Sequence, residues 1–179
     1  MSQYVIESSR LGLRLLQCSD VGVDYVSWLN DDDSNQYLES RFQRHTQDSV
    51  RVFVGDTLAS ENQHLYGIFA KETGLHIGNI KLGPINIRYS SAGIGLMIGK
   101  PYWRKGYATE SIGLICEYAF QSVGLEKISA GCYEENLGSK RAFEKVGFSV
   151  EGFQKSQVIS QGVRTGVWML GLCRSDFGS

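Results

Sequence analysis

The chain has 179 residues, of which 42% are hydrophobic and 21% are charged, and its formal net charge is −1. This is the composition of an ordinary globular domain with room for a sizeable core. A net charge so close to zero gives no general attraction to nucleic acid or to an anionic membrane, so neither is an expected partner.

The cysteines and histidines offer no metal-binding spacing, and we expect no metal site. No Cys-x-x-Cys pair occurs, and the cysteines are interpreted as free thiols of a reducing compartment. The sequence has no signal-peptide pattern and no apolar run of membrane-spanning length. We therefore expect a cytoplasmic protein without a membrane partner.

The first part of the chain predicts a strand followed by a helix. Leucines alternate with polar or small residues over 10–16, which is typical of a strand with one buried face. Asp20 is a suitable N-cap for a helix over about 21–29, and the acidic run 31–33 is expected to end that helix as a loop.

A second helix is predicted after the segment YLESRF, residues 37–42, which itself predicts a short helical turn. Thr46 is expected to cap this helix. Its apolar residues recur at the spacing of a buried helix face, and they are Val50, Phe53, Val54 and Leu58.

The middle of the chain predicts an antiparallel meander of three strands. These strands span 64–71, 75–82 and 90–99, and a tight turn at 72–74 joins the first two. The segment 83–85 contains Gly-Pro and is expected to break the second strand.

The remaining chain alternates helices and strands. An apolar stripe predicts a helix over about 108–120 that Gly124 ends, and a strand follows over 127–132. Asn136 is expected to cap another helix, which Gly147 ends. The last strands are expected at 148–153, around Gln157 and over 164–173. This order of elements predicts a mixed α/β fold in a single domain over 1–179.

The stretch from Ile94 to Ser111 runs from a strand through a basic turn into a helix. Arg104 and Lys105 supply positive charge in the turn, and Gly106 allows the backbone to approach a ligand closely. Backbone N–H groups at a helix N-terminus bind anions, so this turn is a candidate phosphate site. It matches neither a P-loop nor a dinucleotide fingerprint, and an unligated structural turn is the alternative.

Ser139 is the one polar residue on the apolar stripe of the helix that follows Asn136. A hydroxyl that points into the interior of a protein needs a hydrogen-bond partner. Ser139 either bonds back to Asn136 near the start of the helix or faces a reactive centre, and the pattern alone leaves both interpretations open.

These regions, AGIGLMIG with YWRKGYATES and the run from Asn136 to EKVGF, resemble the GCN5-related N-acetyltransferase (GNAT) superfamily. The chain is most similar to the subgroup of ribosomal-protein alanine and serine N-acetyltransferases. The resemblance implies a single-domain α/β (α+β) fold, with a mixed, mostly antiparallel sheet of about seven strands flanked by about four helices. It also implies an enzyme that transfers an acetyl group from acetyl-CoA to a primary amine.

The resemblance further implies where acetyl-CoA binds. The pantetheine arm is expected to pair with strand backbone near Met97, Ile98 and Gly99. Asn136 is expected to bind the end of pantetheine, and Phe143 to pack against the cofactor. The pyrophosphate is expected on the backbone amides of Arg104, Lys105, Gly106, Tyr107, Ala108 and Thr109.

The sequence departs from the family pattern at three positions. Trp103 stands where Gln or Arg often opens the loop, and Arg104 replaces a glycine of the subgroup motif. Phe143 stands where many members have a tyrosine that acts as the general acid, and a phenylalanine cannot donate a proton. In the resembling subgroup a serine on this helix fills that role, and the matching residue is Ser139.

The incoming ammonium must lose a proton before it can attack, so the site needs a base. A neutral amine attacks the thioester directly, and a strand amide near Ile98 is expected to stabilise the negative oxygen. Glu39 in YLESRF is the first candidate for the base, because that loop is expected to border the acceptor side. Tyr133 and Glu134 come next. The isolated histidines His45 and His76 are expected to be structural.

The acceptor is expected to be a protein N-terminus or a small amine, with a nucleotide-linked amino sugar as the specific alternative. Arg41, Arg44 and Arg51 follow Glu39 closely and favour an anionic small acceptor slightly. A non-catalytic acetyl-CoA-binding module is the alternative of another class. The resembling subgroup often forms pairs, so a homodimer is among the expectations.

Overall fold

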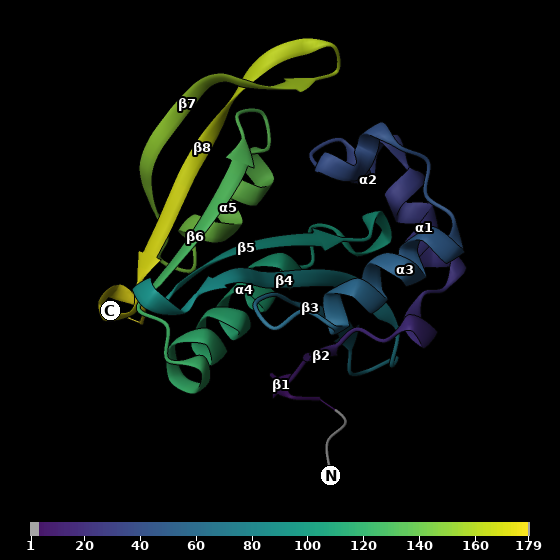
Figure 1. Cartoon of the computed structure of the whole chain (residues 1–179), viewed down its shortest axis with the longest axis horizontal. Helices are drawn as coiled ribbons and strands as arrows, with labels where there is room; N and C mark the ends of the chain where they lie inside the picture. Colours follow the sequence, from purple (N-terminus) through teal and green to yellow (C-terminus); the bar gives the residue numbers. More distant parts are fainter. Residues whose placement is uncertain (1–3, 179) are drawn as a thin grey trace.

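The computed structural model describes residues 4–178, which form one mixed sheet with helices on both faces (Figure 1). The sheet has the strand order β1-β2-β3-β4-β5-β6-β8-β7. The strands are β1 Ile6–Glu7, β2 Leu11–Leu15, β3 His64–Ala70, β4 His76–Asn86, β5 Ser91–Ile98, β6 Lys127–Tyr133, β7 Ser149–Ser160 and β8 Val163–Cys173. The helices are α1 Val23–Asn30, α2 Asp32–Asn35, α3 Gln47–Leu58, α4 Tyr107–Tyr118 and α5 Leu137–Glu144.

The α/β fold class is confirmed, although the sheet has one strand more than expected. The additional strand, β1, is only two residues long, so it is too short to show an alternating pattern in the sequence. The additional helix is α2, a single turn. No helix among residues 4–178 reaches the length and apolarity needed to cross a membrane.

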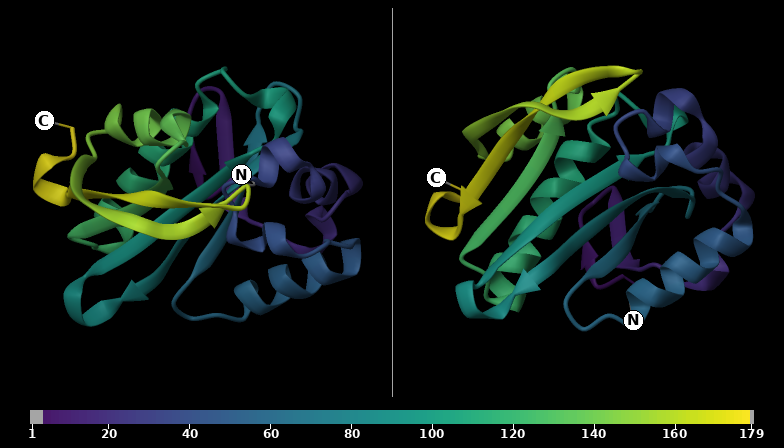
Figure 2. Two further views of the ribbon diagram at one scale, coloured as in Figure 1. Left: turned by 90° about the horizontal axis from the view of Figure 1, so that it is seen from above. Right: turned by 45° about the horizontal axis from the view of Figure 1, so that its top comes forward.

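Helices cover both faces of the sheet, α4 on one and α1 with α3 on the other (Figure 1, Figure 2), and a hydrophobic cluster lies under each. On one face, α4 buries Ile112 and Ile115 against the strands. On the other face, Trp28 of α1 and Val54 of α3 pack in a cluster that includes Met97 of β5. The central strands are therefore covered on both faces, as their apolar sequences require.

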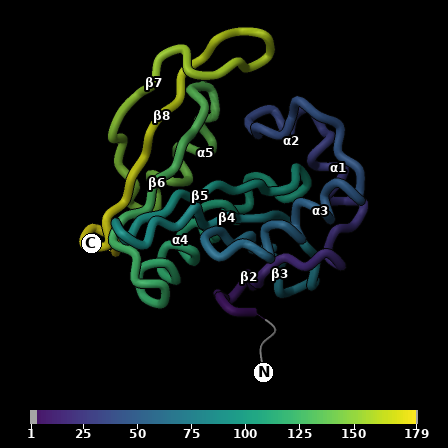
Figure 3. Tube along the Cα trace, viewed as in Figure 1, coloured from purple at the N-terminus to yellow at the C-terminus, as the bar shows by residue number. Residues whose placement is uncertain are grey.

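The sheet is split between β5 and β6. The other neighbouring strands are antiparallel, but these two are parallel and pair only where Ser91–Gly93 meets Lys127–Ser129. Beyond this short ladder, β5 continues to Ile98 and β6 to Tyr133, and the two strands diverge (Figure 3). One edge of β5 is thereby left without a neighbouring strand in the part of the chain that the structure describes.

The predicted N-cap of the first helix is wrong. Asp20 lies in a 3-10 turn, and α1 begins at Val23 with Gly22 as its N-cap. The Asp20 carboxylate instead accepts hydrogen bonds from Arg14 Nη1 at 2.6 Å and from the backbone N–H of Gln17 at 2.8 Å. The Asp20 carboxylate is therefore engaged by residues that precede the helix and does not cap it.

The acidic run 31–33 is also not the loop that was predicted. Asp31 accepts a hydrogen bond from the backbone N–H of Ser34 at 2.8 Å and caps α2. Aspartate is favoured both at the N-cap and in the first turn of a helix, so the same residues that end α1 begin α2.

The predicted cap of α3 is confirmed, because Thr46 and Ser49 form a capping box at its start. Only part of the predicted buried face is correct. Val50 and Val54 are buried, whereas Phe53 and Leu58 are 46% and 38% exposed. The stripe of α3 that packs on the protein is narrower than the apolar stripe of its sequence.

Two predicted strand breaks are wrong. Strand β4 passes through Gly83 and Pro84 with a register shift between Leu82 and Ile85. The segments predicted at 148–153 and around Gln157 form one strand, β7, which contains two register shifts. An irregularity of the bulge type disrupts the local pattern of a strand without ending its pairing, which is why the sequence reads as a break.

Candidate active site

The free edge of β5 presents the backbone of alternate residues to the split. Just beyond β5, the Gly99 N–H donates to Ile77 O of β4 at 2.9 Å, so the backbone groups of the odd-numbered residues of β5 face β4. The backbone groups of Ile94, Leu96 and Ile98 therefore face the opposite way, toward the split. Of the three residues predicted to pair with pantetheine, Ile98 has this orientation, whereas the backbone groups of Met97 and Gly99 are turned to β4.

Trp103 occupies part of this edge. Its indole Nε1–H donates to the Ile98 carbonyl at 2.6 Å, and its side chain is 40% exposed. The carbonyl of Ile98 is thus engaged, and its N–H is the group that remains directed toward the split. This contact explains what the residue does at a position where the family pattern often has Gln or Arg.

The turn after β5 has the backbone shape of an anion site. Arg104 has φ of 62° and Gly106, the N-cap of α4, has φ of 82°. Both values lie in the left-handed region that favours glycine, which accounts for the glycine of the subgroup motif at the position of Arg104. The turn keeps this shape with an arginine in place.

The first turn of α4 offers free N–H donors. Tyr107, Ala108 and Thr109 are its first residues, so their amides have no acceptor within the helix, and Gly106 provides no side-chain cap. Positive helix-end charge and free amides together suit a phosphate group. Lys105 adds an ammonium group, which lies 5.6 Å from the centre of the Tyr102 ring.

The start of α5 supports in part the interpretation that Ser139 bonds back to Asn136. Asn136 is the N-cap as predicted, and its Oδ1 accepts a hydrogen bond from the backbone N–H of Ser139 at 3.1 Å. The Ser139 hydroxyl does not bond back to Asn136 but lies 3.5 Å from Cys132 Sγ on β6. Burial raises the pKa of the Cys132 thiol, so this partner is neutral at physiological pH.

The structure places Phe143 in the core. The side chain is 2% exposed, and its ring lies 5.0 Å from the ring of Phe148 in an edge-to-face arrangement. Little of this ring is left to contact a cofactor. The contact that the resemblance implied therefore has no exposed surface at Phe143.

Two of the three candidates for the base lie in contact. Tyr133 Oη donates a hydrogen bond to Glu39 Oε1 and accepts one from Arg41 Nη1 at 2.8 Å. Burial, followed by the hydrogen bond to Glu39, raises the pKa of Tyr133. The ring of Tyr37 packs edge-to-face on the Tyr133 ring at 5.8 Å. Glu39 and Tyr133 thus form one polar site at the end of β6.

The remaining candidates have structural roles. Glu134 accepts from the Gly166 N–H at 3.0 Å and holds the start of β8. His45 Nε2 lies 2.9 Å from Ser40 O. His76 lies among aromatic rings beside Asn79, and burial lowers its pKa. Among residues 4–178 no group of His, Cys, Asp or Glu side chains is arranged to hold a metal ion.

The two halves of the candidate site meet at β6. Cys132 and Tyr133 are neighbours in this strand, so their side chains point to opposite faces of the sheet. Ser139 contacts the first and Glu39 the second. The candidate acid and the candidate base therefore lie on opposite faces of the sheet, beside the split between β5 and β6.

Sequence reasoning missed Arg10 and Tyr37, and it considered Arg41 as a charge for an anionic acceptor but missed its contact with Tyr133. Arg41 joins the turn Glu39–Phe42 to Tyr133 of β6 and to the Ile159 carbonyl of β7, at 2.5 Å. Arg10 contacts the turn that precedes α4. The partners of both arginines are about a hundred positions away in the chain, and no local pattern reports such pairs.

The chain matches the family model described as "Acetyltransferase (GNAT) domain" over residues 10–149. The uncharacterised N-acetyltransferase YoaA of Bacillus subtilis is 27% identical over 159 residues, covering 88% of this chain and 90% of YoaA. The probable N-acetyltransferase YjcK of the same organism is 36% identical over 110 residues, covering 60% of each chain.

Solved structures share the fold. A spermidine N-acetyltransferase from Vibrio cholerae, in complex with CoA and spermine, superposes with a TM-score of 0.85 at 22% identity, covering 94% of this chain and 98% of the other. A GNAT-family acetyltransferase from Bacillus anthracis gives a TM-score of 0.83 at 22% identity, covering 95% and 98%.

Proposed function

The chain belongs to the GNAT acetyltransferase family and is an acetyl-CoA-dependent N-acetyltransferase, and on that premise we propose that its acceptor is a small, positively charged amine. The observation that carries this proposal is the contact between Glu39 and Tyr133 at the end of β6. A carboxylate beside a phenol binds an ammonium group and then takes up its proton. In the nearby acidic run, Asp33 is paired with Lys100 and Asp31 caps α2, so Asp32 is the carboxylate of this run that adds to the attraction for a cation.

In the proposed reaction the neutral amine nitrogen attacks the carbonyl carbon of the thioester and forms the new C–N bond. The carbonyl oxygen gains negative charge, which the N–H of Ile98 stabilises at the free edge of β5. Collapse of this intermediate breaks the C–S bond, and the Ser139 hydroxyl protonates the leaving thiolate. Glu39 takes the first proton from the ammonium before the attack and releases it to solvent. The nitrogen loses a second proton as the intermediate collapses, and this proton passes through water to restore the Ser139 hydroxyl.

The cofactor side of the proposal uses the split and the turn after it. Acetyl-CoA lies along the free edge of β5, with its diphosphate on the amides of residues 104–109. Asn136 remains a candidate ligand through its amide Nδ2, because its Oδ1 is occupied as a helix cap. Phe143 supports this region from the core rather than by contact.

A protein N-terminus, the acceptor of the ribosomal-protein subgroup, is the less favoured candidate. Such an acceptor needs an open groove beside the turn Glu39–Phe42. Arg41 Nη2 instead donates to Ile159 O and bridges this turn to β7. The bridge connects the two sides that an open groove would separate, which favours a small amine over a polypeptide.

A nucleotide-linked amino sugar would need free cations near Glu39. Arg41 is used in the contacts with Tyr133 and Ile159, and Arg51 forms an ion pair with Asp48 at 3.7 Å. Two of the three arginines that favoured an anionic acceptor are therefore engaged. The polyamines, on which the Vibrio cholerae neighbour acts, are the first acceptors to examine.

We also propose a reducing compartment, the cytoplasm, and pairing of two copies. The four free cysteines include the buried Cys116 and Cys132, which is typical of a reducing environment. Strand β7 is the last strand of the sheet, so its outer edge is unpaired, and it exposes the apolar side chains of Val150, Phe153 and Ile159, which a second copy would cover. Light scattering of the purified protein measures the oligomeric state directly.

The proposed acceptor class is tested by acetyl-CoA turnover over polyamines, amino sugars, nucleotide-linked amino sugars and short peptides, with mass spectrometry of each product. We expect kcat/KM to be highest for an amine with at least one further positive charge. Highest activity on peptides or on nucleotide-linked sugars would contradict the proposal.

A further inference from the structure

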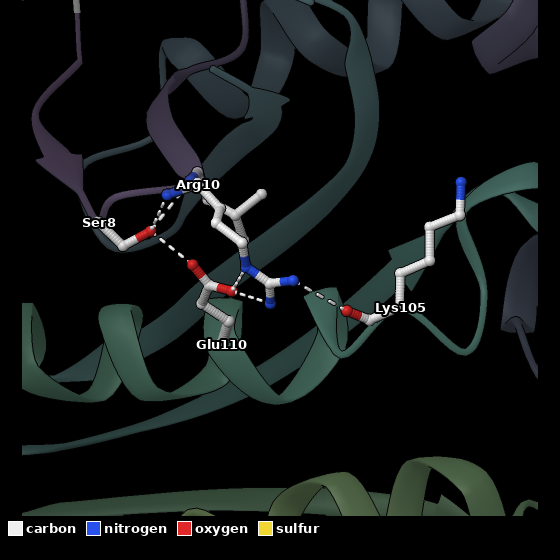
Figure 4. A network of polar contacts seen from close by, with 5 residues as sticks. Ser8, Arg10, Lys105 and Glu110 are labelled. Atoms are coloured by element: carbon white, nitrogen blue, oxygen red, sulfur yellow. Dashed lines mark hydrogen bonds and ion pairs between the residues drawn. The ribbon is translucent and has the colours of Figure 1, made fainter. Parts of the chain in front are cut away.

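We infer that Arg10 is a positioning residue that shapes the diphosphate-binding turn of the acetyl-CoA site, an inference that rests on the proposed function. Arg10 comes just before β2 and lies far from the turn in sequence. Its guanidinium group reaches the Lys105 carbonyl in the turn and the Glu110 carboxylate in α4 (Figure 4). Three observations support a role in holding the amides of the turn toward a phosphate group.

The first observation is a hydrogen bond to the backbone of the turn. Arg10 Nη1 donates to the Lys105 carbonyl at 3.2 Å. In a trans peptide the C=O and the following N–H point in opposite directions. When Arg10 binds the carbonyl of Lys105, the N–H of Gly106 is directed away from β2. Arg10 thereby fixes the orientation of one amide in the proposed cradle.

The second observation concerns the charge of Glu110. This carboxylate lies in the first turn of α4, close to the free amides that would bind the diphosphate. Arg10 Nε donates to Glu110 Oε2 at 2.9 Å, Nη2 donates to the same oxygen, and Ser8 Oγ donates to Oε1 at 2.5 Å. Without Arg10, a carboxylate without a countercharge would lie beside a bound anion and repel it.

The third observation is the strain of the turn. Arg104 has φ of 62°, a conformation that residues other than glycine adopt at a cost. Such a conformation persists when the surrounding structure restrains it. Arg10 restrains the end of this turn, because it bonds to the carbonyl of Lys105, the residue after Arg104, and its guanidinium carbon lies 5.1 Å from the centre of the Tyr107 ring. One side chain thus contacts the turn, the helix start and Glu110.

The test compares two acetyl donors in the wild-type protein and in Arg10→Gln. Acetyl-CoA carries the diphosphate, whereas S-acetylpantetheine lacks it, so a defect in the cradle affects the first donor only. We expect R10Q to raise KM for acetyl-CoA about tenfold, the effect of losing a hydrogen bond from a charged group, and to change kcat less than twofold. The kcat/KM value for S-acetylpantetheine should stay within twofold of wild type.

Matched variants distinguish a specific effect of Arg10 on the turn from a general loss of stability. Arg174→Gln makes the same substitution in another Arg–Glu pair, that with Glu126 at 3.2 Å, and should leave the ratio of the two donors unchanged. Glu110→Gln leaves Arg10 free to keep its hydrogen bond to the Lys105 carbonyl. The double variant R10Q/E110Q lacks the repelling carboxylate, so it should recover part of the affinity for acetyl-CoA that R10Q loses. Arg10→Lys keeps the positive charge but lacks the planar guanidinium group, so its KM for acetyl-CoA should lie between those of R10Q and wild type.

An R10Q variant that keeps the wild-type KM for acetyl-CoA, or that loses activity equally with both donors, would overturn the inference. Where R10Q does not fold, as judged by thermal melting, the same donor ratio is read from R10K. A wild-type protein that transfers acetyl to no amine from either donor contradicts the proposed function itself. The two failures are therefore distinguishable.

Discussion

The hydroxyl of Tyr133 donates a hydrogen bond to the carboxylate of Glu39, a residue 94 positions earlier in the chain. This bond joins the turn Glu39–Phe42 to the end of β6, and Arg41 reinforces it with its own bond to the same hydroxyl at 2.8 Å. The contact places a carboxylate next to the split of the sheet, on the face opposite to Ser139. The proposed division into an acceptor side and a cofactor side follows from it.

Replacing Glu39 with glutamine removes the proposed base while keeping an acceptor for the Tyr133 hydroxyl. We expect kcat/KM for the amine to fall about a hundredfold, the usual contribution of a general base, while the affinity for CoA is unchanged. Steady-state kinetics and CoA titration measure the two effects. Glu61→Gln, at an exposed position, is the matched control. Equal activity of E39Q and wild type would exclude Glu39 as the base.

Replacing Ser139 with alanine removes the proposed acid. The hydroxyl contacts Cys132 Sγ, and burial raises the pKa of that thiol, which makes it a weaker proton donor to the CoA thiolate than an exposed thiol would be. We expect kcat to fall at least tenfold with CoA binding intact, because the Ser139 N–H still bonds to Asn136 and α5 keeps its cap. Turnover that is unchanged across the pH range would rule out this role.

Replacing Phe143 with alanine tests whether its ring belongs to the core. The side chain is 2% exposed and packs on Phe148, so truncation leaves a cavity. We expect the free energy of unfolding in urea to fall by about 3–5 kcal/mol. Phe143→Leu should cost less and should leave KM for acetyl-CoA unchanged. A stable F143A protein with a raised KM would instead make Phe143 a cofactor contact.

The buried His76 predicts a loss of stability in acid. Burial lowers its pKa below the ordinary value of 6.5, so the folded state holds a neutral imidazole where the unfolded state binds a proton. This contribution to stability is complete above pH 6.5 and is lost as the pH falls below it. We expect Tm to decrease from pH 6.5 to 5 in wild type, and less in His76→Gln, which does not titrate.

Thermal melting of both proteins at pH 8 provides the reference for His76, since the imidazole is neutral in both states there. Glutamine also retains an amide that can bond to Asn79, the partner of His76 at 2.9 Å. A decrease in Tm between pH 6.5 and 5 that is the same in H76Q and wild type would show that other groups cause the acid effect.

Much of the fold could be predicted from local patterns. Periods of two and of about 3.6 residues located β2, β5, β6 and α4, and Thr46 and Asn136 were found as helix caps because capping uses residues that are close in sequence. The errors share a cause. Asp20 has the right chemistry for a cap, but Arg14 and Gln17 use its carboxylate first. A local pattern cannot show which of several available partners a side chain takes.

The sequence by itself determined the family, the basic turn before α4 and the serine of α5, because each depends on residues that lie close together in the chain. Only the tertiary structure decided that Phe143 is buried, that Ile98 rather than Met97 faces the split, and that Glu39 meets Tyr133. It also brought Arg10 to the turn at Lys105. The physical reason is that the packing of the whole chain fixes burial, strand register and contacts between distant side chains. Local propensity depends on neighbouring residues and cannot predict them.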